Sequence, residues 1–461
     1  MDLEGVKRRI GWLILPFLPF LLIMSSSNRS RNPDHVRPLN RPSPPNEAIE
    51  ARIKSLLSSA VFSQGASYRG LGLRERVLNL PVMVASVLML LWRQVTSVHE
   101  LTRVLAREDL FWSGPVKVSQ QALSKRFLSF PAVLFERIFF DLLPQLRQRA
   151  LERKRPLAKS VQQAKLYFEN IYVVDGSTLE ALFRKLKALQ EDTRQSLAGK
   201  IVTVVDLVTR LPVQLWFTPS PHRHDSTYTA EILALSKPGT LWIFDRGFYD
   251  FTFFYALIDQ GAGFITRLKA NAVFSVEQEL LVSDQVRDRL IRLRDGRHLL
   301  RLIEVRFGTK WYRYLTSVVD PSELSARAVA DLYRRRWRIE EAFLTVKRLL
   351  GLSYLWTGSE NGVLLQVWAT WLFFGVLVDL GDEVAEALMV PFDRISLEMV
   401  FRGLYHFMRA YERGEASDPV AYLSAPENRD LGVVKRKRRK RRRHEPDKPD
   451  ENRDLLALDS L

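Results

Sequence analysis

The chain has 461 residues, 46% of them hydrophobic, so it is long enough for two or three structural units with a sizeable core. It carries 69 Lys and Arg against 52 Asp and Glu, a net charge of +17, which favours a polyanionic partner such as nucleic acid. It has no cysteine, which excludes disulfides, cysteine–zinc sites and thiol catalysis.

The amino-terminal segment, 1–46, is interpreted as a hydrophobic leader and a flexible linker. Three cationic residues, 7–9, precede the apolar run GWLILPFLPFLLIM at 11–24. This is the form of a signal peptide, and it is too short and proline-broken for a membrane span. A translated extension upstream of the true start and a hydrophobic tether are the alternatives. Residues 27–45 are rich in Ser, Arg, Asn and Pro, as linkers are.

Residues 47–165 are expected to form an all-helical DNA-binding domain, with helices over 73–92, 98–107 and 134–149. Within it, VSQQALSKRF at 118–127 has Ser119 as its expected N-cap and directs amide and cationic side chains outward. Such a helix suits DNA contact, although many surface helices have the same pattern.

After 165 the pattern changes to mixed α/β. Apolar, β-branched runs predict five strands, at 166–174, 200–206, 211–218, 240–244 and 263–267. Helices are expected at 225–236 and between the last two strands, and the alternating pattern of 273–319 predicts a β-rich insertion. Further helices are expected at 363–387 and 397–412. From 413 the chain is expected to be a basic tail, which includes nine consecutive cations from Lys435 to Arg443; without them the chain still carries +8.

One stretch, DLYRRRWRIEEAFLTVKRLL at 331–350, predicts a helix with a polar stripe. Tyr333, Arg336, Glu340 and Lys347 recur at steps of three, four and seven, which bring them back to the same face. The adjoining apolar stripe, which would dock the helix on a core, consists of Ile339, Phe343, Val346 and Leu350. A carboxylate among cations suits metal and phosphate chemistry. A salt-bridged surface helix is the alternative, because Arg336 and Glu340 form an ordinary i,i+4 pair.

Two aspartates are expected at strand ends. Asp175 follows NIYVV and precedes Gly176, and Asp245 follows LWIF and precedes Arg246 and Gly247. The carboxyl ends of strands in open α/β sheets carry sites, and a carboxylate beside a buried strand is costly unless it is paired or bound to a cation. Each aspartate taken alone is more often a turn or capping residue.

Together with Glu340, the two aspartates form a candidate metal site. Three carboxylates are hard oxygen ligands and suit Mg²⁺ or Mn²⁺ and not zinc. Two such ions about 4 Å apart can activate a water or a 3′-hydroxyl in phosphoryl transfer. Tyr333, Arg336 and Lys347 would then hold the flanking phosphates.

These residues resemble the Y-R-E-K signature of bacterial insertion-sequence transposases of the insertion-sequence-four type. The spacing of the four helix residues matches that signature, and both aspartates precede it in the family's order. The resemblance covers roughly 119–443, and its further motifs are DGS at 175–177, HRHDS at 222–226, DRGFYD at 245–250, RLK at 267–269 and WRIEEAF at 337–343.

The resemblance implies an RNase H-like catalytic domain over 166–412, in which Asp175, Asp245 and Glu340 bind two divalent ions. Members of the family cut transposon ends and join the freed 3′-hydroxyl to target DNA, some through a hairpin that leaves a flipped base. Trp311 is the candidate to stack on that base, although a tryptophan in a β insertion is more often part of a core. Arg246 is a further candidate for contacting phosphate.

The resemblance also implies the partners: double-stranded DNA, both as terminal inverted repeats and as target, and a second copy in a dimer on DNA. A cytoplasmic, nucleoid-associated enzyme with no stable membrane partner is expected. Two rivals are a catalytically inactive, transposase-derived DNA-binding protein and, from the run at 11–24 alone, a membrane-anchored or secreted hydrolase.

Three other polar residues have modest expected roles. Glu341 points about 100° away from Glu340 and is expected to be solvated or to support the site. Asp206 is expected to cap a turn after its strand. His224 is expected either to orient substrate or to lie at the surface.

Overall fold

The computed structural model describes residues 43–95, 97–179, 199–220, 223–293, 296–352, 355–357 and 359–435. The apolar run at 11–24 and residues 436–443 of the basic run lie outside these residues. All candidate residues of the three-carboxylate site lie within them.

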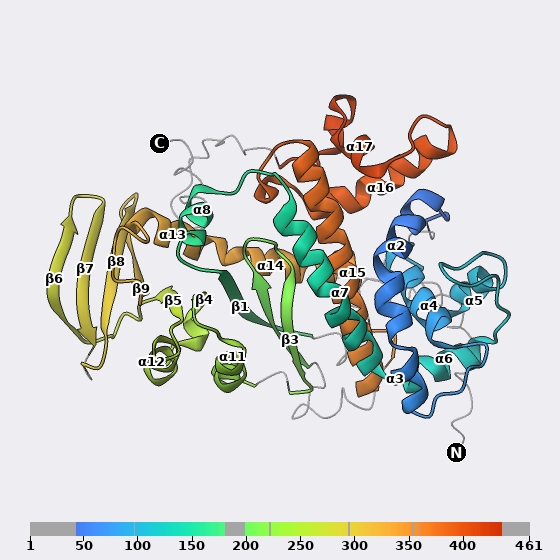
Figure 1. The fold of residues 1–461 in the computed structure, drawn as a ribbon, viewed down its shortest axis with the longest axis horizontal. Coiled ribbons are helices and arrows are strands. Elements are labelled where there is room, and N and C mark those ends of the chain that lie inside the picture. Colours follow the sequence, from blue (N-terminus) through green and yellow to red (C-terminus); the bar gives the residue numbers. More distant parts are fainter. Residues whose placement is uncertain are drawn as a thin grey trace, which may run out of the picture.

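A nine-stranded mixed sheet crosses the molecule in the order β3-β2-β1-β4-β5-β9-β8-β7-β6 (Figure 1). β1 pairs with β4 and β4 with β5 in parallel, and the neighbouring pairs are antiparallel. The strands are β1 (Asn170–Thr178), β2 (Lys200–Asp206), β3 (Pro212–Thr218), β4 (Thr240–Phe244), β5 (Gly263–Arg267), β6 (Phe274–Val282), β7 (Val286–Leu293), β8 (Leu299–Phe307) and β9 (Lys310–Thr316).

The central strands are apolar on both faces because both faces are covered. Side chains alternate along a strand, so Ile171 and Val173 of β1 point to one face, and Tyr172 and Val174 point to the other. The second face packs against α11 (Thr229–Leu235) and α12 (Phe251–Asp259), which lie together on one side of the sheet in Figure 1. The first face packs against the helices that follow the insertion.

The insertion predicted at 273–319 is all β, and it continues the sheet of β1 to β5. β9 pairs with β5 through Ile265↔Thr316 and Arg267↔Tyr314, and β8, β7 and β6 follow in antiparallel order. The inserted strands therefore lengthen one sheet to nine strands and do not fold into a separate layer (Figure 1).

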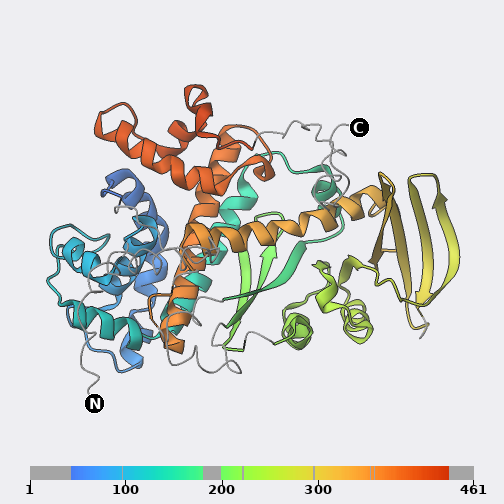
Figure 2. The same cartoon turned by 180° about the vertical axis from the view of Figure 1, so that it is seen from behind.

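The stretch predicted as one helix at 331–350 is part of a longer helical path that runs along the sheet, seen from behind in Figure 2. It comprises α13 (Ala326–Arg335), α14 (Trp337–Leu344) and the π-helical turn η4 (Thr345–Leu349). Ser325 caps its start by accepting a hydrogen bond from the N–H of Ala328. The predicted apolar stripe is buried, as expected: Ile339, Phe343, Val346 and Leu350.

In the described part of 47–165, all helices and strands are α-helices, as predicted. The helices are α2 (Glu47–Ser63), α3 (Gly65–Gly70), α4 (Leu80–Trp92), α5 (Val98–Leu105), α6 (Gln120–Ser129), α7 (Ala132–Glu152) and α8 (Lys159–Lys165). The helix expected from 73 begins only at Leu80, because Asn79 caps it and Pro81 occupies its first turn. Ser119 caps α6 as predicted.

These amino-terminal helices share their core with the rest of the chain. α7 lies along α15 (Glu360–Ala387) in both views, and one apolar cluster runs through both (Figures 1 and 2). Arg149 and Arg153 of α7 pair with Asp379 and Glu383 of α15, and Arg153 also pairs with Asp382. α15 is long and apolar enough to cross a membrane, but 94% of its most apolar window is buried inside the protein, as in a core helix.

The carboxyl-terminal part is more ordered than the expected tail from 413. α16 (Leu397–Glu412) is followed by α17 (Pro419–Ser424) and η6 (Pro426–Leu431). Val434 then forms a β-bridge with Ile395, just after the short helix η5 (Phe392–Arg394). The folded chain therefore continues at least to Lys435.

Candidate active site

The sheet register brings Asp175 and Asp245 together. Parallel pairing of β1 with β4 ends at Val174↔Phe244, so the two aspartates are the next residues on neighbouring strands. Both continue the side-chain alternation toward the face that packs against α14. The prediction that β1 ends at Asp175 was wrong, because antiparallel pairing with β2 continues to Thr178 and pairs Asp175 with Thr203. The parallel ladder is what ends at this point.

The polar stripe of the helix faces these aspartates. Arg336 donates to Asp175, with 2.5 Å between Nη1 and Oδ2, and the same Nη1 lies 3.9 Å from Oε1 of Glu340. Lys347 donates from Nζ to Ser177 Oγ and to the carbonyl of Thr178, both at 2.7 Å. Two cations of the stripe thus contact the end of β1 on either side of Glu340.

The charges of Glu340 and Asp245 both act on Asp175. Burial raises the pKa of Asp175 to about 7; Arg336 opposes the rise, and the negative charges of Glu340 and Asp245 add to it. The pKa of Arg336 is raised although burial lowers it, because Asp175, Tyr333, Asp245 and Glu340 together outweigh burial. Burial also raises the pKa of Tyr333. Side chains from three distant segments therefore share one electrostatic environment.

The set suits a divalent cation in chemistry, but it is bridged by an arginine. In the described part of the chain, no three His, Cys, Asp or Glu side chains stand close enough to hold a metal ion. The guanidinium of Arg336 instead lies between Asp175 and Glu340. Carboxylate oxygens are nevertheless the hard donors that Mg²⁺ and Mn²⁺ prefer, and a bound cation would offset the negative charge that Glu340 and Asp245 impose on Asp175.

The segment that holds these residues is similar to known transposases. Residues 166–372 match the family described as Transposase DDE domain. A protein of Sinorhizobium fredii named "Putative transposase y4zB" is 26% identical over 151 residues, 31% of this chain and 42% of that protein. The chain therefore spans less than half of that relative. Both matches support a transposase, and we call residues 166–372 the DDE segment.

Two further residues of the DDE segment were predicted to contact DNA. Arg246 begins the short helix η3 (Arg246–Phe248) directly after Asp245; its side chain is exposed, and its charge acts on Tyr333. Trp311 lies at the start of β9, partly exposed, with the guanidinium of Arg287 4.5 Å from its ring centre. Trp311 is therefore not a core residue, and it lies three residues before Tyr314, whose ring packs against Tyr333.

Three other polar side chains near the strands have local roles in the structure. Asp206 caps the β2–β3 turn by accepting from the N–H groups of Val208 and Thr209, as predicted. His224 caps η2 (Asp225–Tyr228) and is bonded to Ser226. Asp225, the next residue, lies beside the glycines that follow both aspartates, a position that the motif HRHDS did not reveal.

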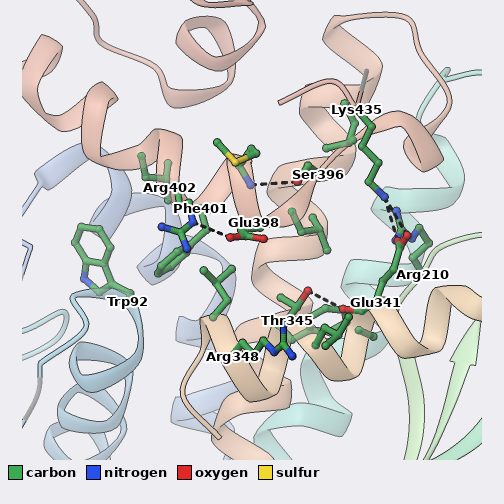
Figure 3. A pocket seen from close by; sticks show the side chains of 18 of the residues that line it. Trp92, Arg210, Glu341, Thr345, Arg348, Ser396, Glu398, Phe401, Arg402 and Lys435 are labelled. Atoms are coloured by element: carbon green, nitrogen blue, oxygen red, sulfur yellow. Dashed lines mark hydrogen bonds and ion pairs between the residues drawn. The ribbon is translucent and has the colours of Figure 1, made fainter. Parts of the chain in front are cut away.

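Glu341 is the centre of an ion cluster on the back of α14. Its carboxylate accepts from Arg210, Arg338 and Lys435, as Figure 3 shows for Arg210 and Lys435. Burial raises the pKa of Glu341, but the three cations outweigh it and lower the pKa to about 2. Glu341 is therefore ion-paired on the face of α14 opposite Glu340 and is not part of the three-carboxylate site.

A groove of about 1080 Å³ lies behind the same helix. Its walls come from α4, α14, η4 and α16, and Figure 3 shows Trp92, Arg348, Phe401 and Arg402 around it. α14 thus separates two surfaces: one bears Glu340 and faces Asp175, and the other bears Glu341 and faces the groove.

Proposed function

We propose that this protein is a DNA transposase of an insertion sequence that cuts transposon ends and transfers the 3′-hydroxyl into target DNA by metal-dependent phosphoryl transfer. The observation that carries the proposal is geometric: Asp175 and Asp245 directly follow the last pair of two parallel neighbouring strands, and Arg336 lies between Asp175 and Glu340 of the helix. The parallel pair β1–β4 beside antiparallel β2 and β3, and the helix across one face, agree with an RNase H-like core of the insertion-sequence-four type.

In the proposed mechanism, Asp175, Asp245 and Glu340 hold Mg²⁺ or Mn²⁺. The bound ions supply Lewis-acid activation of the attacking water or 3′-hydroxyl and charge for the leaving oxygen. Arg336 offsets the carboxylate charge in the protein alone and is placed to contact a phosphate once a cation takes over that role. Lys347, beside Ser177, would neutralise a second DNA phosphate next to the scissile one. The hydroxyl of Tyr333 would orient the DNA strand between these two phosphates.

The proposed partners follow from the charge and from the DDE segment. Double-stranded DNA, as inverted repeats and as target, meets the +17 charge of the chain. The exposed face of α6, with Gln120, Gln121 and Lys125, is the proposed contact of the amino-terminal helices with DNA. We further propose a homodimer on DNA and a cytoplasmic, nucleoid-associated location, since two ends have to be joined.

The test uses purified protein, DNA that carries the inverted repeats flanking the gene, and Mg²⁺. Wild type should nick the repeat ends, whereas Asp175→Asn, Asp245→Asn and Glu340→Gln should bind the same DNA without nicking it. Asp259→Asn is the matched control, because Asp259 pairs with Arg297 at the surface of α12. Binding without cleavage by wild type would favour the inactive, transposase-derived DNA-binding protein. Cleavage retained in any of the three variants would exclude the assignment of that residue.

A further inference from the structure

Each proposed catalytic aspartate is oriented by a glycine close behind it. Asp175 Oδ1 accepts a hydrogen bond from the N–H of Gly176 at 2.9 Å, and Asp245 Oδ1 accepts one from the N–H of Gly247. The position of each carboxylate therefore depends on the backbone of its own glycine.

One further carboxylate packs against both glycines. A methyl group on Gly176 would lie 2.2 Å from Asp225 Oδ1 and 2.8 Å from Lys200 Cε. One on Gly247 would meet Asp245 Oδ1 first, at 2.8 Å, and Asp225 Oδ2 only at an ordinary contact distance of 3.4 Å. Contacts below 3 Å are not tolerated between packed atoms, so at Gly176 the Asp225 carboxylate fills the space that any larger side chain would need.

Asp225 reaches this place from the opposite side of the sheet. Gly176 follows the alternation of Tyr172 and Val174, so it faces the α11 and α12 side, whereas Asp175 faces α14. Asp225 is the first residue of η2, which begins behind the ends of β1 and β4. The backbone of Gly176 thus lies between Asp225 and Asp175, whereas at Gly247 the carboxylates of Asp225 and Asp245 lie near the same position.

Lys200 fixes the Asp225 carboxylate. Its Nζ lies 2.6 Å from Asp225 Oδ1 and donates to the carbonyl of Arg223 at 2.9 Å. Both side chains are largely buried, 11% exposed for Lys200 and 20% for Asp225. Holding a charged pair here costs desolvation, and the cost is offset only if the geometry is well defined.

We propose that Asp225, anchored by Lys200, is a positioning residue that sets the place of the Asp175 carboxylate relative to Asp245 by acting as a wedge against the backbone of Gly176. The proposal rests on the proposed function, because it assigns Asp225 to the same metal site. Loss of a group that orients metal ligands typically lowers metal affinity about 10- to 100-fold.

The experiment measures Mn²⁺ binding by electron paramagnetic resonance and thermal unfolding, on the full chain without DNA. Asp225→Ala should weaken Mn²⁺ binding about 10- to 100-fold. Asp225→Asn keeps an oxygen that can face both Gly176 and the Lys200 ammonium, so it should bind Mn²⁺ clearly more tightly than Asp225→Ala. Equal losses in the Asn and Ala variants would mean that Asp225 acts by charge or as a direct ligand, and would overturn the wedge.

A double-mutant cycle tests the contact itself. Gly176→Ala should weaken Mn²⁺ binding as Asp225→Ala does, because the new methyl group displaces the carboxylate. Combined with Asp225→Ala, it should cost no more than either change alone, both in Mn²⁺ affinity and in unfolding temperature. Gly114→Ala is the control, since its methyl group would meet only Asp109 Oδ1 at 3.9 Å, and its effect should add to that of Asp225→Ala.

The failures of the two proposals are distinguishable. If wild type binds Mn²⁺ and cuts DNA but Gly176→Ala and Asp225→Ala are additive, the wedge is wrong and the transposase proposal stands. If wild type binds no Mn²⁺ and cuts no DNA, the proposed function fails and the positioning role fails with it. Non-additive unfolding temperatures would then leave only a packing contact between Gly176 and Asp225.

Discussion

Arg336 occupies the position that links charge and chemistry in the site. Its guanidinium offsets Asp175 directly and Glu340 at 3.9 Å, so the protein without a metal ion carries its own cation among the carboxylates. Because the pKa of Asp175 is about 7 even beside this cation, the three carboxylates are not fully neutralised by it. In the proposed function, Asp175, Asp245 and Glu340 would hold divalent ions, and Arg336 would be available to contact a phosphate.

Lys347 gives the first prediction at the residue scale. Its ammonium bonds Ser177 and Thr178, which hold it beside the proposed path of the scissile strand. Lys347→Met should lower kcat/KM for end cleavage by the worth of one charge-assisted contact, about 1.5–3 kcal/mol or roughly ten- to 150-fold. The comparison is Lys310→Met, an exposed lysine on β9 that should change kcat/KM by less than about threefold. Equal effects of the two changes would remove Lys347 from the site.

The residues that could be predicted from the sequence are those whose position follows from a period. Tyr333, Arg336, Glu340 and Lys347 share a face because helical spacing decides it, and the structure has Arg336 and Lys347 against β1. Asp225 and Lys200 have no such period. Their place beside Gly176 depends on how η2 folds back behind the sheet, which is a tertiary contact that no local pattern encodes.

At the scale of the element, α14 is held by Glu341 on the face opposite Glu340. Its carboxylate forms ion pairs with Arg210 of the β2–β3 turn, with Arg338 one helical turn earlier, and with Lys435 at the end of the described chain. Glu340 and Glu341 are neighbours with opposite duties, because about 100° of helical rotation separates them. Glu341, which was expected either to be solvated or to support the site, thus fixes the helix that carries Glu340.

Glu341→Gln should therefore flatten the acid side of the stability profile. The pKa of Glu341 is about 2 in the folded protein, below the value of about 4.3 in an unfolded chain. The contribution of ionised Glu341 to the free energy of unfolding is thus full above about pH 5 and lost as the pH falls toward 2. Because 32% of its side chain is exposed, we expect Glu341→Gln to lower the free energy of unfolding by about 1–2 kcal/mol at pH 7.

Urea denaturation between pH 3 and pH 7 measures this difference. Glu398→Gln is the control, because Glu398 pairs with Arg402 at the surface and 57% of its side chain is exposed. It should leave the acid limb unchanged. An acid limb of Glu341→Gln that parallels wild type would show that the cluster adds nothing to folding.

A buried arginine connects the β insertion to the start of α13. Arg301 of β8 is fully buried, donates to Asp288 of β7, and donates to the carbonyl of Leu324, just before the N-cap of α13. Arg301→Met would leave Asp288 buried and unpaired, so we expect a loss of about 3–5 kcal/mol in the free energy of unfolding. Arg313→Met, whose side chain is 47% exposed beside Glu304, should lose less than about 1 kcal/mol. Similar losses would mean that the buried pair is not a fastening.

The insertion also marks the limit of prediction for elements. Alternation identified β strands at 273–319, since it is a local signal. Their partner could not be read from alternation, because the pairing of Arg267 with Tyr314 joins residues far apart in the chain. Strand β9 continues the sheet from β5, which brings Tyr314 next to Tyr333 and so links the insertion with the polar stripe.

At the scale of the whole molecule, the amino-terminal helices and the DDE segment form one packed body. The ion cluster between α7 and α15 is largely buried, with Asp379 and Asp382 almost fully covered. The sequence predicted a separate helical domain because composition changes at about 165, but composition does not report which helices pack together. In the proposed function, a shift of α6 against DNA would be transmitted to α15, which contacts α6 and whose first half lies within the DDE segment.

The basic run gives the prediction at this scale. It starts at Lys435, whose Nζ lies 3.1 Å from Oε2 of Glu341, so the run begins on the face of α14 opposite Glu340. Replacing the eight cations at 436–443 by Gln, with Lys435 kept, should flatten the dependence of non-specific DNA affinity on salt. Each neutralised phosphate contributes about 0.9 to the slope of log K against log salt, so the change is at most about 7.

Affinities for a random duplex between 50 and 300 mM NaCl give the slope, and single-turnover cleavage at saturating protein gives the control. Cleavage of bound ends should keep its wild-type rate, because the run supplies attraction to phosphates and no group of the three-carboxylate site. An unchanged slope would show that the run stays off the DNA. A slower cleavage step at saturation would place the run in the reaction itself and would mean that its anchor at Glu341 does more than hold the helix.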